Sequence, residues 1–257
     1  MLRASLLLAL CAAACPAAPP ERIVSLAPNL TQMVVALGGG GWLAAVTPFC
    51  EVSGDVARLP GGIQPEAEAV LGLDPDLVLA TSMTPAATRR QLRDLGLRVE
   101  VIDADSLEEI RAAQQRLTIL LEVVAPTMPE AAKPAPGRSA ALLFGAETGY
   151  SAGCGTHAHE ILEAAGLRNI AAEAGGPWPQ LGEEFLLAAD PELIVVADYG
   201  QADRESVLQT LRAHPVRRHL AAVRAGRVLV FPAAAFSIPG PAALEAGAAL
   251  QAEVEKL

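Results

Sequence analysis

Short apolar runs alternate with amphipathic stretches along most of the chain. Residues 23–26 are apolar and end in Ala27-Pro28-Asn29, after which a helical pattern continues to the glycines at 38–41. Further apolar runs and helical patterns alternate at 42–47, 66–73, 77–80, 89–95 and 98–102. Strands that alternate with helices at this spacing predict parallel βα units, in which the loops at the carboxyl ends of the strands form the binding edge.

The pattern is interrupted in the middle of the chain and then resumes. Ser106 and Glu109 have the spacing of a capping box, which predicts a helix that begins there and ends near residue 125. Four prolines follow between residues 126 and 137. Because proline lacks a backbone donor and disfavours helix, this segment is predicted as a linker. The apolar run at 140–144 then begins a second α/β region.

The two halves contain similar segments of sequence. Residues 68–79 and 184–195 align without gaps, and they share a Glu, an Asp-Pro pair and two leucines. Each segment reads as a helix, a turn and a buried strand, which favours two lobes of related design. We therefore expect two parallel-sheet α/β lobes joined by a helical connector, with a ligand cleft between the lobes. The expected bounds are 21–105 for the N-terminal lobe, 106–137 for the connector and 138–257 for the C-terminal lobe.

The N-terminus has the layout of a secretory signal. Arg3 precedes an apolar stretch and a run of small residues, so residues 1–15 are predicted to be a signal peptide and the protein to be periplasmic or at the cell surface. Cys15 follows three alanines and resembles the acylation site of bacterial lipoproteins, so lipid attachment and plain cleavage are both open. A disulfide between Cys50 and Cys154 is also left open by the sequence.

Composition and motifs exclude several classes of function. The chain has 19 Lys and Arg against 29 Asp and Glu, a net charge of −10, and lacks a basic cluster, so no nucleic-acid partner is expected. Apart from the leader, no apolar run is long enough for a membrane span. No phosphate-binding loop, nucleophile elbow or HExxH zinc motif occurs, which predicts a protein that is not an enzyme and has no catalytic cofactor.

Cysteine and histidine side chains suggest an alternative metal site. Thr156 can cap a helix that begins at His157, which places Cys154 and His157 at the cleft side of the second lobe, with Cys50 on the opposite lobe. Thiolate and imidazole groups suit Zn²⁺, Cu⁺ or haem iron. The spacing matches no recognised ligand pattern, and His159 lies two residues beyond His157, so the two rings point in different directions on a helix.

Five segments follow one another between residue 21 and the C-terminus: ERIVSLAPNLTQMVVALG, PEAEAVLGLDPDLVLA, GGPWPQLGEEFLLAADPELIVV, RAGRVLVFP and SIPGPAALEAGAAL. In order and spacing they resemble the periplasmic substrate-binding proteins of ABC importers for cobalamin, iron-siderophores and haem, and PWPQ looks most similar to the cobalamin branch. Two features depart from that family. The connector is shortened and rich in proline, and residues 238–242 are Ile-Pro-Gly-Pro-Ala where members commonly have Arg-Pro-Gly-Pro-Arg.

The resemblance implies a function and a set of partners. It implies capture of a cobalamin-like corrinoid and its delivery to the permease of an ABC importer, with Glu68 and Glu184 as the acidic residues that dock on the permease and Glu183 as an adjacent substitute. Membrane contact is then expected only through the permease or a lipid anchor. The alternatives are a haem, siderophore or metal-ion carrier of the same class, and a scaffold with this fold and no ligand.

The resemblance also points to loops that face the ligand. A corrinoid needs broad apolar walls with a few polar groups, so aromatic side chains on these loops are the first candidates. The residues expected to contact the ligand are Pro28, Asn29, Phe49, Cys50, Tyr150, Trp178 and Phe236.

Overall fold

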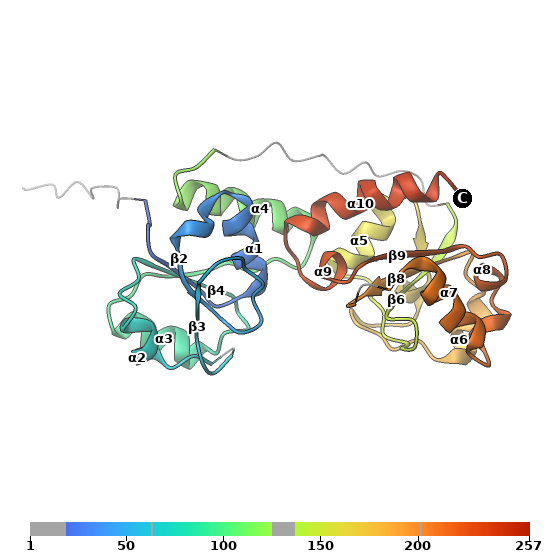
Figure 1. Cartoon of the computed structure of the whole chain (residues 1–257), viewed down its shortest axis with the longest axis horizontal. Helices are drawn as coiled ribbons and strands as arrows, with labels where there is room; N and C mark the ends of the chain where they lie inside the picture. The colour runs from blue at the N-terminus through green and yellow to red at the C-terminus, as the bar shows by residue number, and fades with distance from the viewer. Residues whose placement is uncertain (1–18, 63, 125–136, 201) are drawn as a thin grey trace, which may run out of the picture.

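The computed structural model describes residues 19–62, 64–124, 137–200 and 202–257, which form two α/β lobes side by side (Figure 1). The predicted signal peptide with Cys15, and all but the last residue of the predicted linker, lie outside the described residues. The expectations about leader, lipid attachment and linker therefore stay predictions.

The first lobe is built on a five-stranded parallel sheet with the strand order β3-β2-β1-β4-β5. Its strands are β1 (Ile23–Ser25), β2 (Leu43–Val46), β3 (Ala57–Arg58), β4 (Leu77–Ala80) and β5 (Val99–Val101). Its helices are α1 (Pro28–Ala36), the short 3-10 helix η1 (Gly39–Trp42), α2 (Ala67–Leu71) and α3 (Ala86–Asp94), and α4 (Leu107–Leu120) follows in the predicted connector. The strand order reverses between β1 and β4, so the loops that follow these two strands diverge and leave a crevice.

The second lobe has a four-stranded parallel sheet with the order β7-β6-β8-β9, which reverses between β6 and β8. Its strands are β6 (Ser139–Phe144), β7 (Arg168–Asn169), β8 (Leu193–Asp198) and β9 (Val228–Pro232). Its helices are α5 (His157–Ala164), η2 (Ile170–Glu173), α6 (Glu183–Ala189), α7 (Arg204–Ala213), η3 (Arg217–His219), α8 (Ala221–Arg224), α9 (Ala234–Ser237) and α10 (Pro241–Val254). The expected α/β class, with two parallel sheets, is confirmed.

The two similar segments of sequence have the same local structure. The first runs from α2 through an Asp-Pro turn into β4, and the second runs from α6 through an Asp-Pro turn into β8. Asp74 and Asp190 both have a positive φ, 47° and 35°. Aspartate tolerates this left-handed conformation better than most residues, which ends the helix and turns the chain toward the strand.

Each central strand is buried on both faces. In β4, Leu77 and Leu79 face one apolar cluster, whereas Val78 and Ala80 face another that contains Leu92 of α3. Alternate residues of a strand point to opposite faces, so an apolar run without polar interruption is what a sheet covered on both sides requires. The strand expected at 77–80 is confirmed at the same residues.

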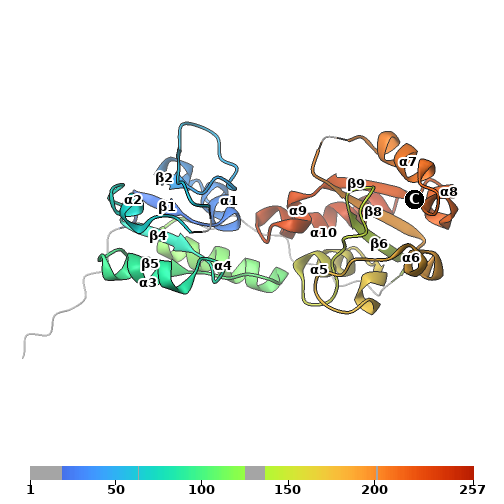
Figure 2. The same cartoon turned by 90° about the horizontal axis from the view of Figure 1, so that it is seen from below.

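One apolar core is shared by both lobes. It contains Leu79 of the first sheet and Val195 of the second, together with Leu117 of α4 and Leu250 of α10. Helix α10 packs against α1, α4 and α5, and Figures 1 and 2 show α4 of the first half and α10 of the second meeting at the junction. A Cβ at Gly247 would lie 3.0 Å from the Cβ of Ala164, so glycine allows α10 to lie close against α5.

A hydrogen bond also crosses the junction at the start of α4. Ser106 and Glu109 form the predicted capping box. Glu160 of α5 adds a further acceptor, because its Oε2 lies 2.7 Å from the backbone nitrogen of Leu107. The first amides of a helix have no partner within the helix, so this carboxylate satisfies one of them from the other lobe. The helix ends at Leu120, five residues before the end expected from the sequence, and Leu121 is its C-cap.

Replacement of Glu160 by alanine should weaken the junction. The substitution leaves the amide of Leu107 without its acceptor, so we expect a loss of about 1–2 kcal/mol in the free energy of unfolding, measured by urea denaturation. Glu245→Ala, at an exposed position of α10, is the matched control and should change the free energy by less than about 0.5 kcal/mol. Equal losses in the two variants would contradict the interlobe role of Glu160.

Candidate functional site

A cavity of about 310 Å³ lies at the crevice of the first sheet. One wall is formed where the chain passes from β1 into α1, at Pro28 and Asn29, and another by the loop after β4, with Met83. Phe49, from the loop after β2, contributes a third wall. The carboxyl ends of parallel strands meet at the same edge of a sheet, and the reversal of strand order opens that edge to a ligand.

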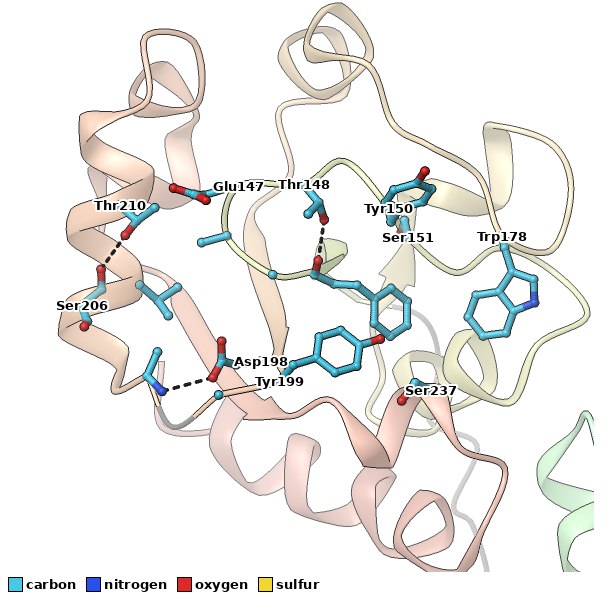
Figure 3. A pocket seen from close by; sticks show the side chains of 16 residues that line it. Glu147, Thr148, Tyr150, Ser151, Trp178, Asp198, Tyr199, Ser206, Thr210 and Ser237 are labelled. Carbon is cyan, nitrogen blue, oxygen red and sulfur yellow. Dashed lines mark hydrogen bonds between the residues drawn. The ribbon is translucent and has the colours of Figure 1, made fainter. Parts of the chain in front are cut away.

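A larger cavity of about 820 Å³ lies at the equivalent place in the second sheet (Figure 3). The loop after β6 lines it with Glu147 and Tyr150, the end of β8 and the loop that follows line it with Asp198 and Tyr199, and one side is formed by α7. Ser237 lines both cavities, and residues 237–239 complete the smaller one. The two cavities are therefore neighbours at the junction of the lobes.

Aromatic side chains form a wall of the larger cavity. The ring of Phe144 lies 5.9 Å from that of Trp178 and 6.4 Å from that of Tyr199, measured between centroids, and both pairs are tilted. Tyr150, Trp178 and Tyr199 are 56%, 50% and 72% exposed. Large apolar side chains that stay exposed inside a cavity are typical of a site that a bulky apolar ligand covers.

The smaller cavity presents a corresponding apolar surface from the other lobe. Phe49 is 63% exposed and Met83 is 75% exposed, and both line the cavity. The site thus offers apolar groups from both lobes to a ligand placed between them.

Trp178 is held in place by backbone hydrogen bonds between two loops. The nitrogen of Ser151 lies 2.9 Å from the oxygen of Pro179, and that of Gly153 lies 2.8 Å from the oxygen of Pro177. A Cβ at Gly153 would lie 2.5 Å from the oxygen of Gly176, so only glycine permits this approach. The two prolines restrict the backbone on either side of Trp178, which reduces the entropy lost when the indole is held at the cavity.

Comparison with known proteins identifies the family. Residues 104–235 match the family model described as periplasmic binding protein. The chain is 31% identical to a cobalamin-binding protein of Halobacterium salinarum, over 88% of this chain and 67% of that protein. It is 29% identical to a vitamin B12-binding protein of Pectobacterium carotovorum, over 79% of each. The chain belongs to the periplasmic binding protein family.

Solved structures of periplasmic binding proteins share its fold. The haem-binding protein of Vibrio cholerae superposes with a TM-score of 0.73 at 20% identity, covering 91% of this chain and 98% of that one. The vitamin B12-binding protein of the same organism gives 0.66 at 22% identity, over 92% and 97% of the two chains. A haem-binding protein of Pseudomonas aeruginosa gives 0.68 at 28% identity, over 91% and 92%. Periplasmic binding proteins are carriers that act outside the cytoplasm and perform no catalysis.

Most aromatic and first-loop residues predicted from the sequence lie at the two cavities of this binding protein. Pro28, Asn29 and Phe49 line the smaller cavity, and Tyr150 and Trp178 line the larger one. Whether they contact a ligand stays a prediction.

Met83 and Tyr199 were missed by the sequence analysis. Each follows within three residues of the end of a buried strand, β4 and β8 respectively. The rule that ligands bind at the carboxyl ends of parallel strands would have singled them out, because both are large apolar residues in a loop at that edge.

Two residues predicted to contact the ligand, Phe236 and Cys50, are buried and line neither cavity. Phe236 is fully buried and its ring packs edge-on against Phe231, at 6.0 Å between centroids. Ser237, the next residue, faces the cavities in its place. Cys50 is buried in the shared core, and its Sγ lies 3.2 Å from Oγ1 of Thr47, a residue that lines the smaller cavity.

The described structure does not bring together Cys50, Cys154 and His157, the residues expected to hold a metal ion. Thr156 caps α5 as predicted. Cys154, however, is exposed and its Sγ lies 3.9 Å from Nε2 of His159, whereas His157 is buried. Both thiols are free, and the described part of the chain contains no group of three or more His, Cys, Asp or Glu side chains that could hold a metal ion.

Arg217 is a buried cation that fixes the loop after β6. Its Nη1 donates to the carbonyl oxygens of Ala146 and Thr148, at 2.7 and 2.8 Å. Its Nη2 donates to Oε1 of Glu183 at 2.6 Å. The guanidinium is paired in a charge-assisted fork and anchors a wall of the larger cavity. Glu183 is therefore engaged within the lobe, whereas its neighbour Glu184 is exposed.

His157 lies beneath the aromatic wall. It is 2% exposed, its ring lies 6.4 Å from that of Trp178, and its Nε2 has no hydrogen-bond partner among the described residues. Burial lowers the pKa of His157 to about 4, and a hydrogen bond with the backbone of Phe236 opposes this to a lesser extent. The imidazole is therefore neutral at pH 7.

This burial predicts a pH dependence of stability. Because the pKa of His157 is about 4 in the fold and 6.5 in the unfolded chain, unfolding takes up a proton between these values. The free energy of unfolding should fall by up to about 3 kcal/mol through His157 as pH drops from 7 to 4, measured by urea denaturation. His157→Phe should remove this part of the dependence of the unfolding free energy on pH, and His219→Gln, at an exposed site, should retain it. An unchanged slope in His157→Phe would contradict the assignment.

Proposed function

We propose that this binding protein captures a cobalamin-like corrinoid between its lobes and presents it to the permease of an ABC importer. The observation that carries the proposal is the pair of neighbouring cavities, whose aromatic and apolar side chains remain exposed on both lobes. The relatives from Halobacterium salinarum and Pectobacterium carotovorum, described as cobalamin-binding and vitamin B12-binding, support the same ligand class.

A corrinoid fits these walls physically. Its macrocycle is broad and apolar on its faces, so indole, phenol and phenyl rings can cover it and release water from both surfaces. Tyr199 and Trp178 would meet one side of the ligand, and Phe49 the other. The mechanism is binding without chemistry, in which the affinity comes from burial of apolar surface and a few polar contacts.

A haem carrier is the second candidate. The phenol groups of Tyr150 and Tyr199 line the larger cavity, and tyrosine is an established axial ligand of haem iron. The fold shared with haem-binding proteins is consistent with this alternative. A carrier of bare metal ions is not favoured, because the described residues do not gather ligands of the kind that such ions require.

We further propose that Glu68 and Glu184 dock the protein on its permease. Both are exposed and lie in the first turns of α2 and α6, at matching places in the two similar segments. Figure 1 shows α2 and α6 along the same edge of the molecule. Complementary charge at such an interface steers association and fixes orientation. The engagement of Glu183 with Arg217 leaves Glu184 as the second docking carboxylate.

Export and lobe boundaries complete the proposal. Residues 1–15 serve as the signal peptide, with lipid attachment at Cys15 or plain cleavage as the alternatives. Residues 21–105 and 138–257 form the two lobes, and 106–137 connect them. Among the described residues, no helix combines the length and apolar character needed to cross a bilayer.

Calorimetric titration of the mature protein with cyanocobalamin tests the ligand. We expect saturable one-to-one binding, and Trp178→Ala should weaken it about ten-fold or more, because truncation of a central aromatic contact typically costs over about 1 kcal/mol. Ile119→Ala, at an exposed site of α4 away from both cavities, should bind as tightly as the unaltered protein. No saturable binding, or a Trp178→Ala variant of unchanged affinity, would count against the site.

The docking residues are tested by charge reversal. Glu68→Arg with Glu184→Arg should abolish uptake of labelled cyanocobalamin by cells that carry this protein as their only binding protein, since like charges then meet at the permease. The affinity of this double variant for cyanocobalamin, measured by calorimetry, should be unchanged. Glu108→Arg with Glu245→Arg, on α4 and α10, makes the same change in net charge and should support normal uptake. Normal uptake with the first pair would refute the docking role.

A further inference from the structure

The polar side chains of both cavities are acidic or neutral. Carboxylates line both cavities. Asp103 and Asp105 line the smaller cavity, and Glu147 and Asp198 line the larger one. No lysine, arginine or histidine is among the described residues that line either cavity. A negative lining of this kind favours a ligand that donates hydrogen bonds or carries positive charge over one that carries carboxylates.

The acidic groups of the larger cavity lie on its side away from Trp178. Figure 3 shows Glu147, Asp198, Ser206 and Thr210 on the side formed by α7, opposite the indole. Asp198 Oδ2 accepts from the backbone nitrogen of Ala202 at 3.1 Å, which fixes the orientation of the carboxylate. Among the described residues, no donor contacts Asp198 Oδ1 or the carboxylate of Glu147. Within the part of the chain that the structure describes, both groups are therefore left to donors from a ligand.

Ser151 lies beside Tyr150 on the Trp178 side of the same cavity (Figure 3) and provides an independent sign of a polar ligand. It is 1% exposed and lines the cavity, yet its Oγ has no hydrogen-bond partner among the described residues. A buried hydroxyl group without a partner is costly, and in native proteins such a group has usually been left for water or a ligand.

We propose that Glu147 and Asp198 form an acidic subsite for the amide-bearing edge of the ligand, that this subsite rejects carboxylates, and that Ser151 contacts the ligand on the opposite side of the same cavity. The inference rests on the proposed function and refines it. The edge of a cobalamin bears primary amides, whose N–H groups complement the open carboxylate oxygens. The edge of haem bears propionates, which these carboxylates repel. Proteins with this fold bind either corrinoids or haem, and the acidic subsite favours the corrinoid.

The sharpest probes are cyanocobalamin and its monocarboxylic acids, in which mild hydrolysis has converted one peripheral amide to a carboxylate. Ring, metal and size are the same, so a difference in affinity reports the charge at one edge position. For the unaltered protein at pH 7, calorimetry should show that at least one separated isomer binds about ten-fold or more weakly than cyanocobalamin, because a site built for a donor penalises its replacement. Equal affinity of every isomer overturns the subsite.

Variants assign the selectivity to particular residues. The double variant Asp198→Asn with Glu147→Gln should bind cyanocobalamin and its monocarboxylic acids with affinities within about three-fold of each other. Amide side chains both accept and donate hydrogen bonds and carry no charge. Glu205→Gln, exposed on α7 and outside the cavity lining, is the matched control and should retain full selectivity. Selectivity that survives in the double variant overturns the assignment to these carboxylates.

Ser151→Ala separates a ligand contact from a structural role. Because its hydroxyl has no partner among the residues that the structure describes, the variant should unfold at the same or a higher urea concentration and still bind cyanocobalamin more weakly. Unchanged affinity overturns the role of Ser151. Failure of the unaltered protein to bind cyanocobalamin refutes the proposed function itself and the subsite with it, whereas binding without selectivity refutes the subsite alone.

Discussion

The apolar core that both lobes share is the constraint on which the site depends. Leu79 and Val195 belong to different sheets, yet they contribute to one buried cluster with side chains of α4 and α10. Separation of the lobes would expose this surface to water, at a cost proportional to the apolar area. The lobes therefore hold a defined orientation, and Ser237 lines both cavities at once. A broad ligand can meet walls that are already in place, which reduces the entropy lost on binding.

Strand order determines where those walls form. Each sheet reverses its order once, and each cavity lies at the loops that follow the two strands on either side of the reversal. The similar segments that contain Asp74 and Asp190 build the edge of each lobe in the same way and place Glu68 and Glu184 at equivalent positions. The lobes differ in what the loops carry. The second lobe adds the aromatic wall, and its buried Arg217 fixes the loop after β6 beside that wall.

Local sequence patterns predicted the helices and strands. The burial of individual side chains depends on contacts between residues far apart in the sequence, and these patterns do not contain that information. The run at 77–80 and the capping box at Ser106 depend on neighbours in sequence, so both were found. The resemblance of whole segments placed Phe49 and Trp178 at cavity loops. Phe236 lies in the right segment, but its burial depends on Phe231, and the burial of Cys50 depends on the shared core. No local signal reports which of two adjacent side chains faces inward.

A crystal structure of the mature protein grown with cyanocobalamin tests the central claim most directly. The account predicts the corrin ring between the lobes, with Phe49 and Met83 on one side and Trp178 and Tyr199 on the other, and with amide groups of its edge at Glu147 and Asp198. The shared core should be unchanged. A corrinoid found outside both cavities, or lobes that separate at α4 and α10 to admit it, would contradict the account.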